Sequence, residues 1–218
     1  MAYQRNPVFV ALDTQEVNRA VYLARHLAPA VGGVKLGLEF FMANGPAGVR
    51  EVSATGLPVF LDLKLHDIPN TVAKAVKAAI PLRPAIMTLH AQAGSAALRA
   101  AADAAREEAR NLGAIPPRMV AVTVLTSLEA ADLNAMGVAD APDAQVDRLA
   151  TLAVESGMDG VVCSPREAAH LRQSLGPVAT LVVPGIRPKG AATGDQKRVM
   201  GPTDAMAAGA DVLVVGRP

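Results

Sequence analysis

The sequence has little cysteine and almost no excess of charge of either sign. Its 218 residues include one cysteine, Cys163, which cannot form an intrachain disulfide. The 21 basic and 20 acidic residues give a net charge of +1, which removes any general argument for binding nucleic acid or an anionic membrane. Neither a Cys-x-x-Cys nor a His-x-x-x-His pair occurs, so we expect no dedicated transition-metal site.

Long apolar runs are absent too. The alanine-rich segments carry a charged residue every few positions, which is typical of surface helices rather than membrane spans. The first seven residues lack the basic-then-apolar pattern of a secretory signal. We therefore expect a cytoplasmic protein with no membrane partner.

Eight short apolar or β-branched runs alternate with amphipathic stretches. The runs cover residues 8–13, 33–37, 58–65, 85–90, 119–126, 160–164, 180–185 and 212–217. The stretches between them, such as 15–27, 71–80, 95–111, 143–155 and 165–175, have apolar residues at helical spacing. This alternation predicts a single (β/α)8 barrel domain over residues 1–218. A doubly wound open sheet is the alternative, but no Gly-x-Gly-x-x-Gly follows the first run.

The third run contains charged residues that need an explanation. Asp62 and Lys64 alternate with leucines, and Asp67 follows shortly after them. Alternate strand residues point to one face, so the Cα atoms of Asp62 and Lys64 would lie roughly 7 Å apart on the same side. Burying such charges is costly unless they are paired. A structural ion pair is the simpler interpretation of any isolated Asp-x-Lys, whereas a catalytic site is the alternative.

The ends of the other predicted strands are also polar, and catalysis in such barrels takes place at the carboxyl ends of the strands. These residues include Asp13, Lys35, His90, Thr126, Ser127, Pro184, Arg187, Gly216 and Arg217. Loops after strands seven and eight commonly bind phosphate, so Arg187, Gln196, Gly216 and Arg217 predict a phosphate site. The long glycine-containing connection over residues 187–201 is either a lid or an ordinary surface loop.

Lys64 lies among carboxylates, which favour its charged form. An ammonium group cannot form a Schiff base without losing its proton, but it can stabilise a developing carbanion and then protonate it. This arrangement suits proton transfer at carbon.

Residues 60–72, Phe-Leu-Asp-Leu-Lys-Leu-His-Asp-Ile-Pro-Asn-Thr-Val, resemble the signature of the orotidine 5'-phosphate decarboxylase family. Further motifs of that family occur in order along nearly the whole chain. They are Ala-Leu-Asp at 11–13, Lys-Leu-Gly at 35–37, Leu-Thr-Ser at 125–127, Pro-Gly-Ile-Arg at 184–187, Gly-Asp-Gln at 194–196 and Val-Gly-Arg-Pro at 215–218.

The resemblance implies a cofactor-free and metal-free decarboxylation of orotidine 5'-monophosphate to uridine 5'-monophosphate. Lys64 would be the proton donor, with Asp62, Asp67 and Lys35 completing the catalytic group. The implied substrate-binding residues are Asp13, Lys35, Asp62, Ile68, Thr71, Thr126, Ser127, Pro184, Arg187, Gln196, Gly216 and Arg217. Asp67 and Thr71 would serve the neighbouring subunit, which implies a homodimer.

Two other functions are compatible with parts of the pattern. A magnesium-dependent sugar-phosphate lyase of the same superfamily shares Asp-x-Lys-x-x-Asp, although residues 66–71 and 194–196 match the decarboxylase pattern better. A catalytically silent phosphate-binding barrel is the second, and the retained Lys64 argues against it. The family also continues through a helix after strand eight, so we expect that this sequence, which stops at Pro218, lacks the last helix.

Overall fold

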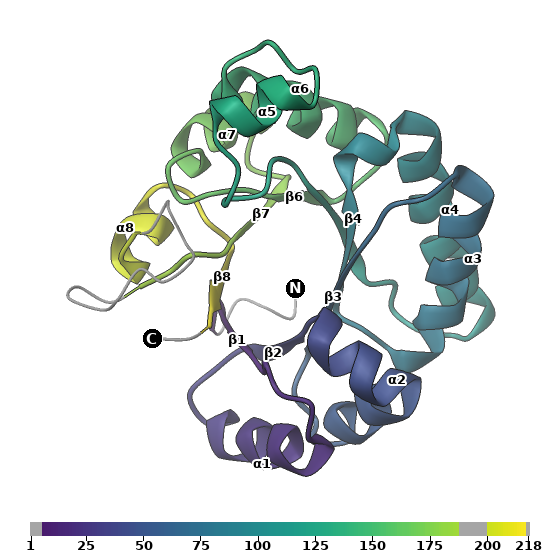
Figure 1. Cartoon of the computed structure of the whole chain (residues 1–218). Helices are drawn as coiled ribbons and strands as arrows, with labels where there is room; N and C mark the ends of the chain where they lie inside the picture. The colour runs from purple at the N-terminus through teal and green to yellow at the C-terminus, as the bar shows by residue number, and fades with distance from the viewer. Residues whose placement is uncertain (1–5, 188–199, 217–218) are drawn as a thin grey trace.

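The computed structural model describes residues 6–187 and 200–216. In this part of the chain, eight parallel strands close into a barrel in sequence order, with the helices outside it (Figure 1). The strands are β1 (Val8–Ala11), β2 (Gly33–Leu36), β3 (Val59–Leu65), β4 (Ile86–His90), β5 (Arg118–Val122), β6 (Gly160–Val162), β7 (Thr180–Val183) and β8 (Val212–Val215). The predicted (β/α)8 barrel is confirmed.

The α-helices are α1 (Val17–Leu27), α2 (Leu38–Ser53), α3 (Pro69–Ala79), α4 (Ser95–Asn111), α5 (Ala130–Ala135), α6 (Pro142–Glu155), α7 (Ala168–Leu175) and α8 (Pro202–Ala207). Among the described residues, one α-helix follows each of β1 to β4, β6 and β7, whereas two, α5 and α6, lie between β5 and β6. Helix α2 is kinked at Gly45, whose φ of 56° is non-helical and precedes Pro46. No helix within the described ranges is long and apolar enough to cross a membrane.

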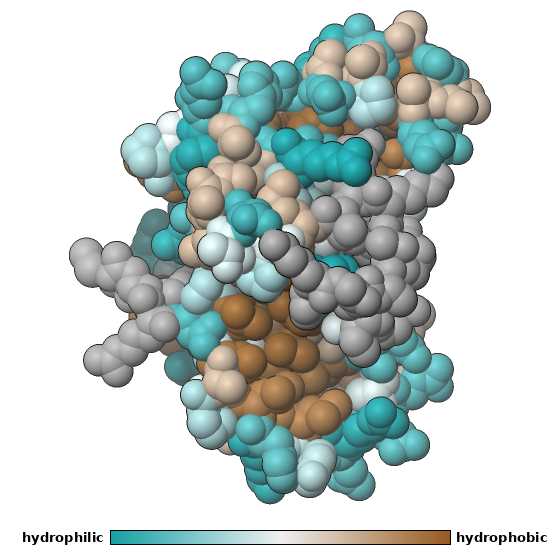
Figure 2. Space-filling view, turned by 90° about the vertical axis from the view of Figure 1, so that its left-hand side faces the viewer, coloured by the Kyte–Doolittle hydropathy of each residue, from teal (hydrophilic) through white to brown (hydrophobic). Residues whose placement is uncertain are grey.

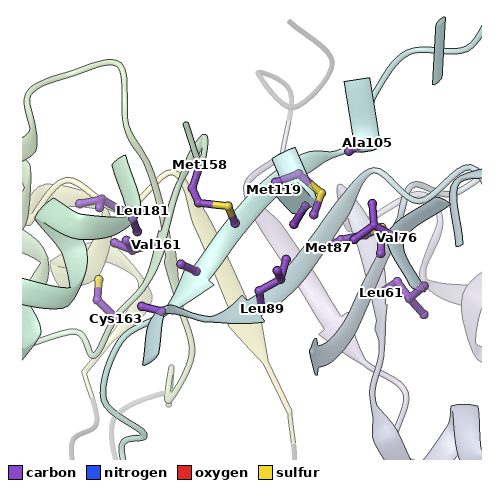
Figure 3. Packing of buried hydrophobic residues seen from close by; sticks show 14 of the residues in the cluster. Leu61, Val76, Met87, Leu89, Ala105, Met119, Met158, Val161, Cys163 and Leu181 are labelled. Atoms are coloured by element: carbon purple, nitrogen blue, oxygen red, sulfur yellow. The ribbon is translucent and has the colours of Figure 1, made fainter. Parts of the chain in front are cut away.

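Strand alternation divides the apolar side chains into two layers. Phe9, Phe60 and Ile86 belong to a small cluster inside the barrel, where the two phenyl rings meet edge to face at 6.4 Å. The larger cluster lies between the strands and the helices, and Figure 3 shows Met87 of β4 close to Val76 of α3 within it. The two layers cover both faces of each strand. The side chains of the strands are therefore mostly apolar, except near the carboxyl ends of the strands.

Several strands end earlier than the sequence predicts. Strand β5 ends at Val122, although the apolar run continues to residue 126. The Thr123 hydroxyl donates a hydrogen bond to the carbonyl oxygen of Val162 at 3.1 Å, where the chain leaves the sheet. Thr126 and Ser127 therefore lie in the connection to α5 rather than at the end of a strand.

The barrel closes where the first strand meets the last. Val8 pairs with Leu213 and Val10 with Val215 in parallel register. Figure 2, which views the side on which β1 and β8 lie, shows an apolar area bordered by hydrophilic side chains. Within residues 200–216, α8 precedes β8 and no helix follows it.

Candidate active site

A cavity of about 300 Å³ opens at the carboxyl ends of the strands, where barrels of this type carry their active sites. The first half of the chain lines it with four charged residues that the sequence singled out: Asp13, Lys35, Asp62 and Lys64. The second half lines it with Thr126, Ser127, Pro184, Arg187 and Gly216. The fold thus brings most of the predicted site residues to one cavity.

Asp62 is the centre of the charged group. Its Oδ2 atom lies 2.8 Å from Lys64 Nζ and 3.4 Å from Lys35 Nζ. Lys35 Nζ is also 3.9 Å from Asp13 Oδ1. Negative and positive groups therefore alternate across the cavity, and each lysine has a carboxylate beside it.

The Asp62 carboxylate is buried, with only 7% of the residue exposed. Burial by itself raises the pKa of Asp62, but the charges of Lys35 and Lys64 and hydrogen bonds from Lys64 and Thr88 outweigh that effect. The pKa of Asp62 is therefore held below its usual value. Asp62 stays ionised and keeps an acceptor next to the Lys64 ammonium group.

Lys64 reaches this position through an irregular backbone. Its φ of 50° lies in the left-handed region, which costs a residue with a side chain on the order of 1–3 kcal/mol. The register of β3 and β4 shifts between Leu61 and Leu65. Asp62 and Lys64 do meet as predicted, but they lie in an irregular stretch of β3 and not in the regular strand that the prediction assumed.

Thr88 of β4 belongs to the same group of contacts and was missed by the sequence analysis. It is 1% exposed, donates a hydrogen bond to Asp62 Oδ1 at 3.0 Å and accepts one from the Lys64 backbone N–H at 2.9 Å. The available signal was a hydroxyl group between apolar neighbours in β4, two residues after the inward-facing Ile86.

Two histidines lie near Lys64. The rings of His66 and His90 are 5.5 Å apart between centroids. Burial lowers the pKa of His90, and the nearby His66 and Lys64 lower it further. A neutral His90 therefore adds no further positive charge to the Lys35 and Lys64 pair at neutral pH.

The opposite wall of the cavity offers donors to an anion. Arg187 follows β7 and Gly216 follows β8, and both line the cavity. Arg187 donates from Nη1 to the carbonyl oxygen of Ile186 at 3.0 Å, whereas its buried Nε has no hydrogen-bond partner among the described residues. Burying an N–H donor of this kind lowers the stability of the fold unless another group accepts a hydrogen bond from it.

Cys163 also lines the cavity but has a different character. It is 1% exposed, and burial raises the pKa of its thiol far above the usual range. It contributes an apolar surface rather than a nucleophile.

This arrangement of lysines and carboxylates at the mouth of a barrel agrees with a family match over nearly the whole chain. The family model described as "Orotidine 5'-phosphate decarboxylase / HUMPS family" matches residues 6–218. The chain belongs to this family.

Curated relatives in the family are closely similar to the chain. Proteins named orotidine 5'-phosphate decarboxylase from Paramagnetospirillum magneticum and Rhodospirillum rubrum are 57% and 58% identical over 213 and 215 residues. The alignments cover 98% of this chain in both cases, and 91% and 87% of the two relatives.

Solved structures agree with the fold. The orotidine 5'-phosphate decarboxylase of Lactobacillus acidophilus superposes with a TM-score of 0.83 at 35% identity, covering 98% of this chain and 91% of that one. An uncharacterized conserved protein from Geobacillus kaustophilus gives a TM-score of 0.84 at 34% identity, covering 97% and 91%.

Three predicted site residues within the family signature do not line the cavity of their own chain. Asp67, Ile68 and Thr71 are exposed, between β3 and the first turn of α3. Asp67 Oδ1 accepts a hydrogen bond from the backbone N–H of Ile68 at 2.7 Å. Their side chains are therefore available to another molecule.

Two further predicted site residues, Gln196 and Arg217, lie outside the described residues. The same holds for most of the predicted lid, residues 188–199.

Proposed function

We propose that this protein decarboxylates orotidine 5'-monophosphate to uridine 5'-monophosphate, the last step of de novo pyrimidine biosynthesis. The observation that carries the proposal is the Lys35–Asp62–Lys64 group in the cavity. Family membership and relatives of that name at more than half identity support it.

The reaction breaks the bond between the pyrimidine ring and its carboxylate. Carbon dioxide leaves, and the electron pair stays on the ring carbon as a carbanion. In our proposal the Lys64 ammonium group stabilises this charge, donates its proton to the carbon and later regains a proton from water. Asp62 holds the ammonium group in place at 2.8 Å.

Lys64 supplies only part of the rate enhancement. An ammonium group about 4 Å from a developing charge contributes about 4 kcal/mol at an effective dielectric constant of about 20. Enzymes lower barriers by up to about 23 kcal/mol. We propose that binding of the remote phosphate by Arg187 and Gly216, with Gln196 and Arg217, supplies much of the remainder, since such binding energy can orient the reacting group and exclude water.

The rest of the substrate would bind along the cavity wall. We propose that Asp13 and Lys35 hold the ribose hydroxyls, because a carboxylate and an ammonium group 3.9 Å apart offer both acceptors and donors. Thr126 and Ser127 would contact the pyrimidine, and Pro184 would pack beside it.

We also propose that the enzyme is a homodimer in which Asp67, Ile68 and Thr71 complete the cavity of the partner subunit. Their exposure outside their own cavity supports this arrangement. Exposed apolar side chains at the same end of the barrel support it further: Ile68 is 66% exposed, and Leu38 and Met42, near the start of α2, are 52% and 80% exposed. A cytoplasmic location stays a prediction.

An ultraviolet progress curve with orotidine 5'-monophosphate tests the reaction. Wild-type protein in excess EDTA should consume the substrate, whereas Lys64→Ala should not. Turnover only after addition of Mg²⁺, and with a sugar phosphate instead of the nucleotide, would indicate the metal-dependent lyase of the same superfamily. Nucleotide binding without turnover would indicate a silent binding barrel.

A further inference from the structure

We propose that Thr88 is a positioning residue for decarboxylation: its hydroxyl group holds both the Asp62 carboxylate and the backbone of Lys64, and thereby aims the Lys64 ammonium group. This inference rests on the proposed function and adds to it a residue outside the family motifs quoted above.

The first observation is the place of Thr88 in the sheet. Leu61 pairs with Met87 and Leu65 with Leu89, so three residues of β3 lie opposite Thr88 alone. The regular ladder is broken over this stretch. The Thr88 side chain faces the barrel interior, because Ile86 does so while Met87 and Leu89 belong to the outer cluster.

The second observation is how the hydroxyl group is used. Thr88 Oγ1 donates its single proton to Asp62 Oδ1 at 3.0 Å and accepts the Lys64 N–H at 2.9 Å. The Lys64 backbone N–H therefore has an acceptor in the bulge, where its positive φ takes it out of the ladder. Valine has nearly the same shape as threonine but can form neither bond.

The third observation is that the two oxygens of Asp62 have different partners. Oδ1 receives the Thr88 hydroxyl, whereas Oδ2 lies next to Lys64 Nζ and Lys35 Nζ. The Thr88 bond fixes the rotation of the carboxylate and so the direction in which Oδ2 holds the ammonium group. Lys64 is thus positioned at both ends, at its backbone directly and at its amine through Asp62.

The test compares Thr88→Val and Thr88→Ser. We expect Thr88→Val to lower kcat about tenfold or more while KM changes less than about threefold, because binding groups stay in place. Thr88→Ser should stay within about threefold of wild type in both. The loss of a hydrogen bond to the ionised Asp62 raises its pKa, so the acid limb of the pH profile should move to higher pH in Thr88→Val only.

Thr180→Val is the matched control. Thr180 is a buried threonine at the start of β7, bonded to Arg118 and far from the cavity mouth, so its replacement affects stability rather than kcat. If Thr88→Val does not fold, Thr88→Ala takes its place in the same comparison. Wild-type kcat in the folded variant, an unmoved acid limb, or equal loss in Thr88→Ser would overturn the proposal.

A readout without turnover separates this inference from the proposed function. The carboxyl ¹³C signal of Asp62, assigned with Asp62→Asn, can be titrated in wild type and Thr88→Val. A higher Asp62 pKa in the variant supports the positioning contact even if wild type does not act on orotidine 5'-monophosphate, and an unchanged titration contradicts it.

Discussion

Lys64 combines a rare backbone conformation with a central place among the charges. Its positive φ persists because the Thr88 hydroxyl accepts its N–H and Asp62 holds its amine. Strained residues that are fixed by several contacts are found mainly at functional sites. The strain therefore has a use: it places the end of a long side chain where regular strand geometry would not.

Replacing Lys64 tests the amine directly. We expect Lys64→Ala to lower kcat at least about 10³-fold, which corresponds to the loss of about 4 kcal/mol of charge stabilisation. Lys64→Arg should also be inactive, because arginine keeps a positive charge but does not give up its proton. Lys77→Ala, which removes an exposed lysine paired with Glu107, is the control and should keep its activity. Stopped-flow or steady-state rates decide the matter, and substantial turnover by Lys64→Arg would contradict proton donation.

Asp62 makes a pH-dependent contribution to stability. Its folded pKa lies below the ordinary value of 3.8, so ionised Asp62 stabilises the fold above that pH, and this stabilisation is lost as the pH falls through the folded pKa. Asp62→Asn should be about 2 kcal/mol less stable than wild type at pH 7, because Lys64 loses its carboxylate partner and Lys35 keeps only Asp13. Urea unfolding at several pH values should show this gap closing as the pH falls below 3.8 and through the folded pKa of Asp62. A gap that does not change with pH would contradict the argument.

At the scale of elements, Arg172 of α7 joins the amino-terminal ends of β7 and β8. Its guanidinium group donates to the carbonyl oxygens of Gly176, Ala179 and Gly209 and lies 2.5 Å from Asp211 Oδ2. The side chain is 22% exposed. These contacts fix the end of the barrel opposite the cavity.

We expect Arg172→Ala to lower the free energy of unfolding by about 2–3 kcal/mol, because several carbonyl groups lose a charged donor. Arg99→Ala, on the exposed face of α4 with a bond to Ser95, should change it by less than about 0.5 kcal/mol. Chemical denaturation measures both. Similar effects of the two variants would show that the Arg172 contacts are not stabilising.

The sequence predicts the strands and many of the helices because each strand is buried on both faces and each long helix on one. It does not predict where β5 ends, because the Thr123 hydroxyl group just after β5 donates a hydrogen bond to the carbonyl oxygen of Val162 on the neighbouring strand. The sequence of β5 alone does not show this contact. The sequence does not predict the bulge in β3 either. The register of β3 shifts against β4, and the apolar residues of β3 alone give no sign of a shift that depends on the neighbouring strand.

The sequence likewise predicts some residues of the candidate site and not others. Residues at strand ends, such as Asp13, Lys35 and Arg187, could be predicted because the closed barrel brings all strand ends together. The inward-facing hydroxyl group of Thr88 could have been noticed, but its role could not be predicted, because that role depends on atoms of β3 that sequence spacing does not place. The roles proposed for Asp67 and Thr71 depend on a second chain, so neither sequence spacing nor the fold of a single chain predicts them.

At the scale of the whole molecule, a homodimer with shared sites can be tested by mixing inactive variants. Lys64→Ala and Asp67→Ala should each be nearly inactive alone. In a mixed dimer one site contains both changes and the other contains neither, so after random exchange about a quarter of wild-type activity should return. Rates after unfolding and refolding the mixture measure this recovery.

A second mixture provides the control. Asp62 and Lys64 lie 2.8 Å apart in one chain, so Asp62→Ala and Lys64→Ala inactivate different sites of their mixed dimer and leave none intact. That mixture should stay inactive. Equal recovery in both mixtures, or none in the first, would contradict a site shared between subunits.

The junction of β1 with β8 joins the two ends of the described chain. The Leu213 N–H donates to the carbonyl oxygen of Pro7 at 2.9 Å, and the cavity is lined by Ala11 from one side of this junction and Gly216 from the other. Contacts between residues so distant in sequence are the slowest to form and the most costly in chain entropy. A molecule that fills the cavity contacts both sides and bridges this junction, so the free energy of unfolding of the occupied enzyme rises with the concentration of what it binds.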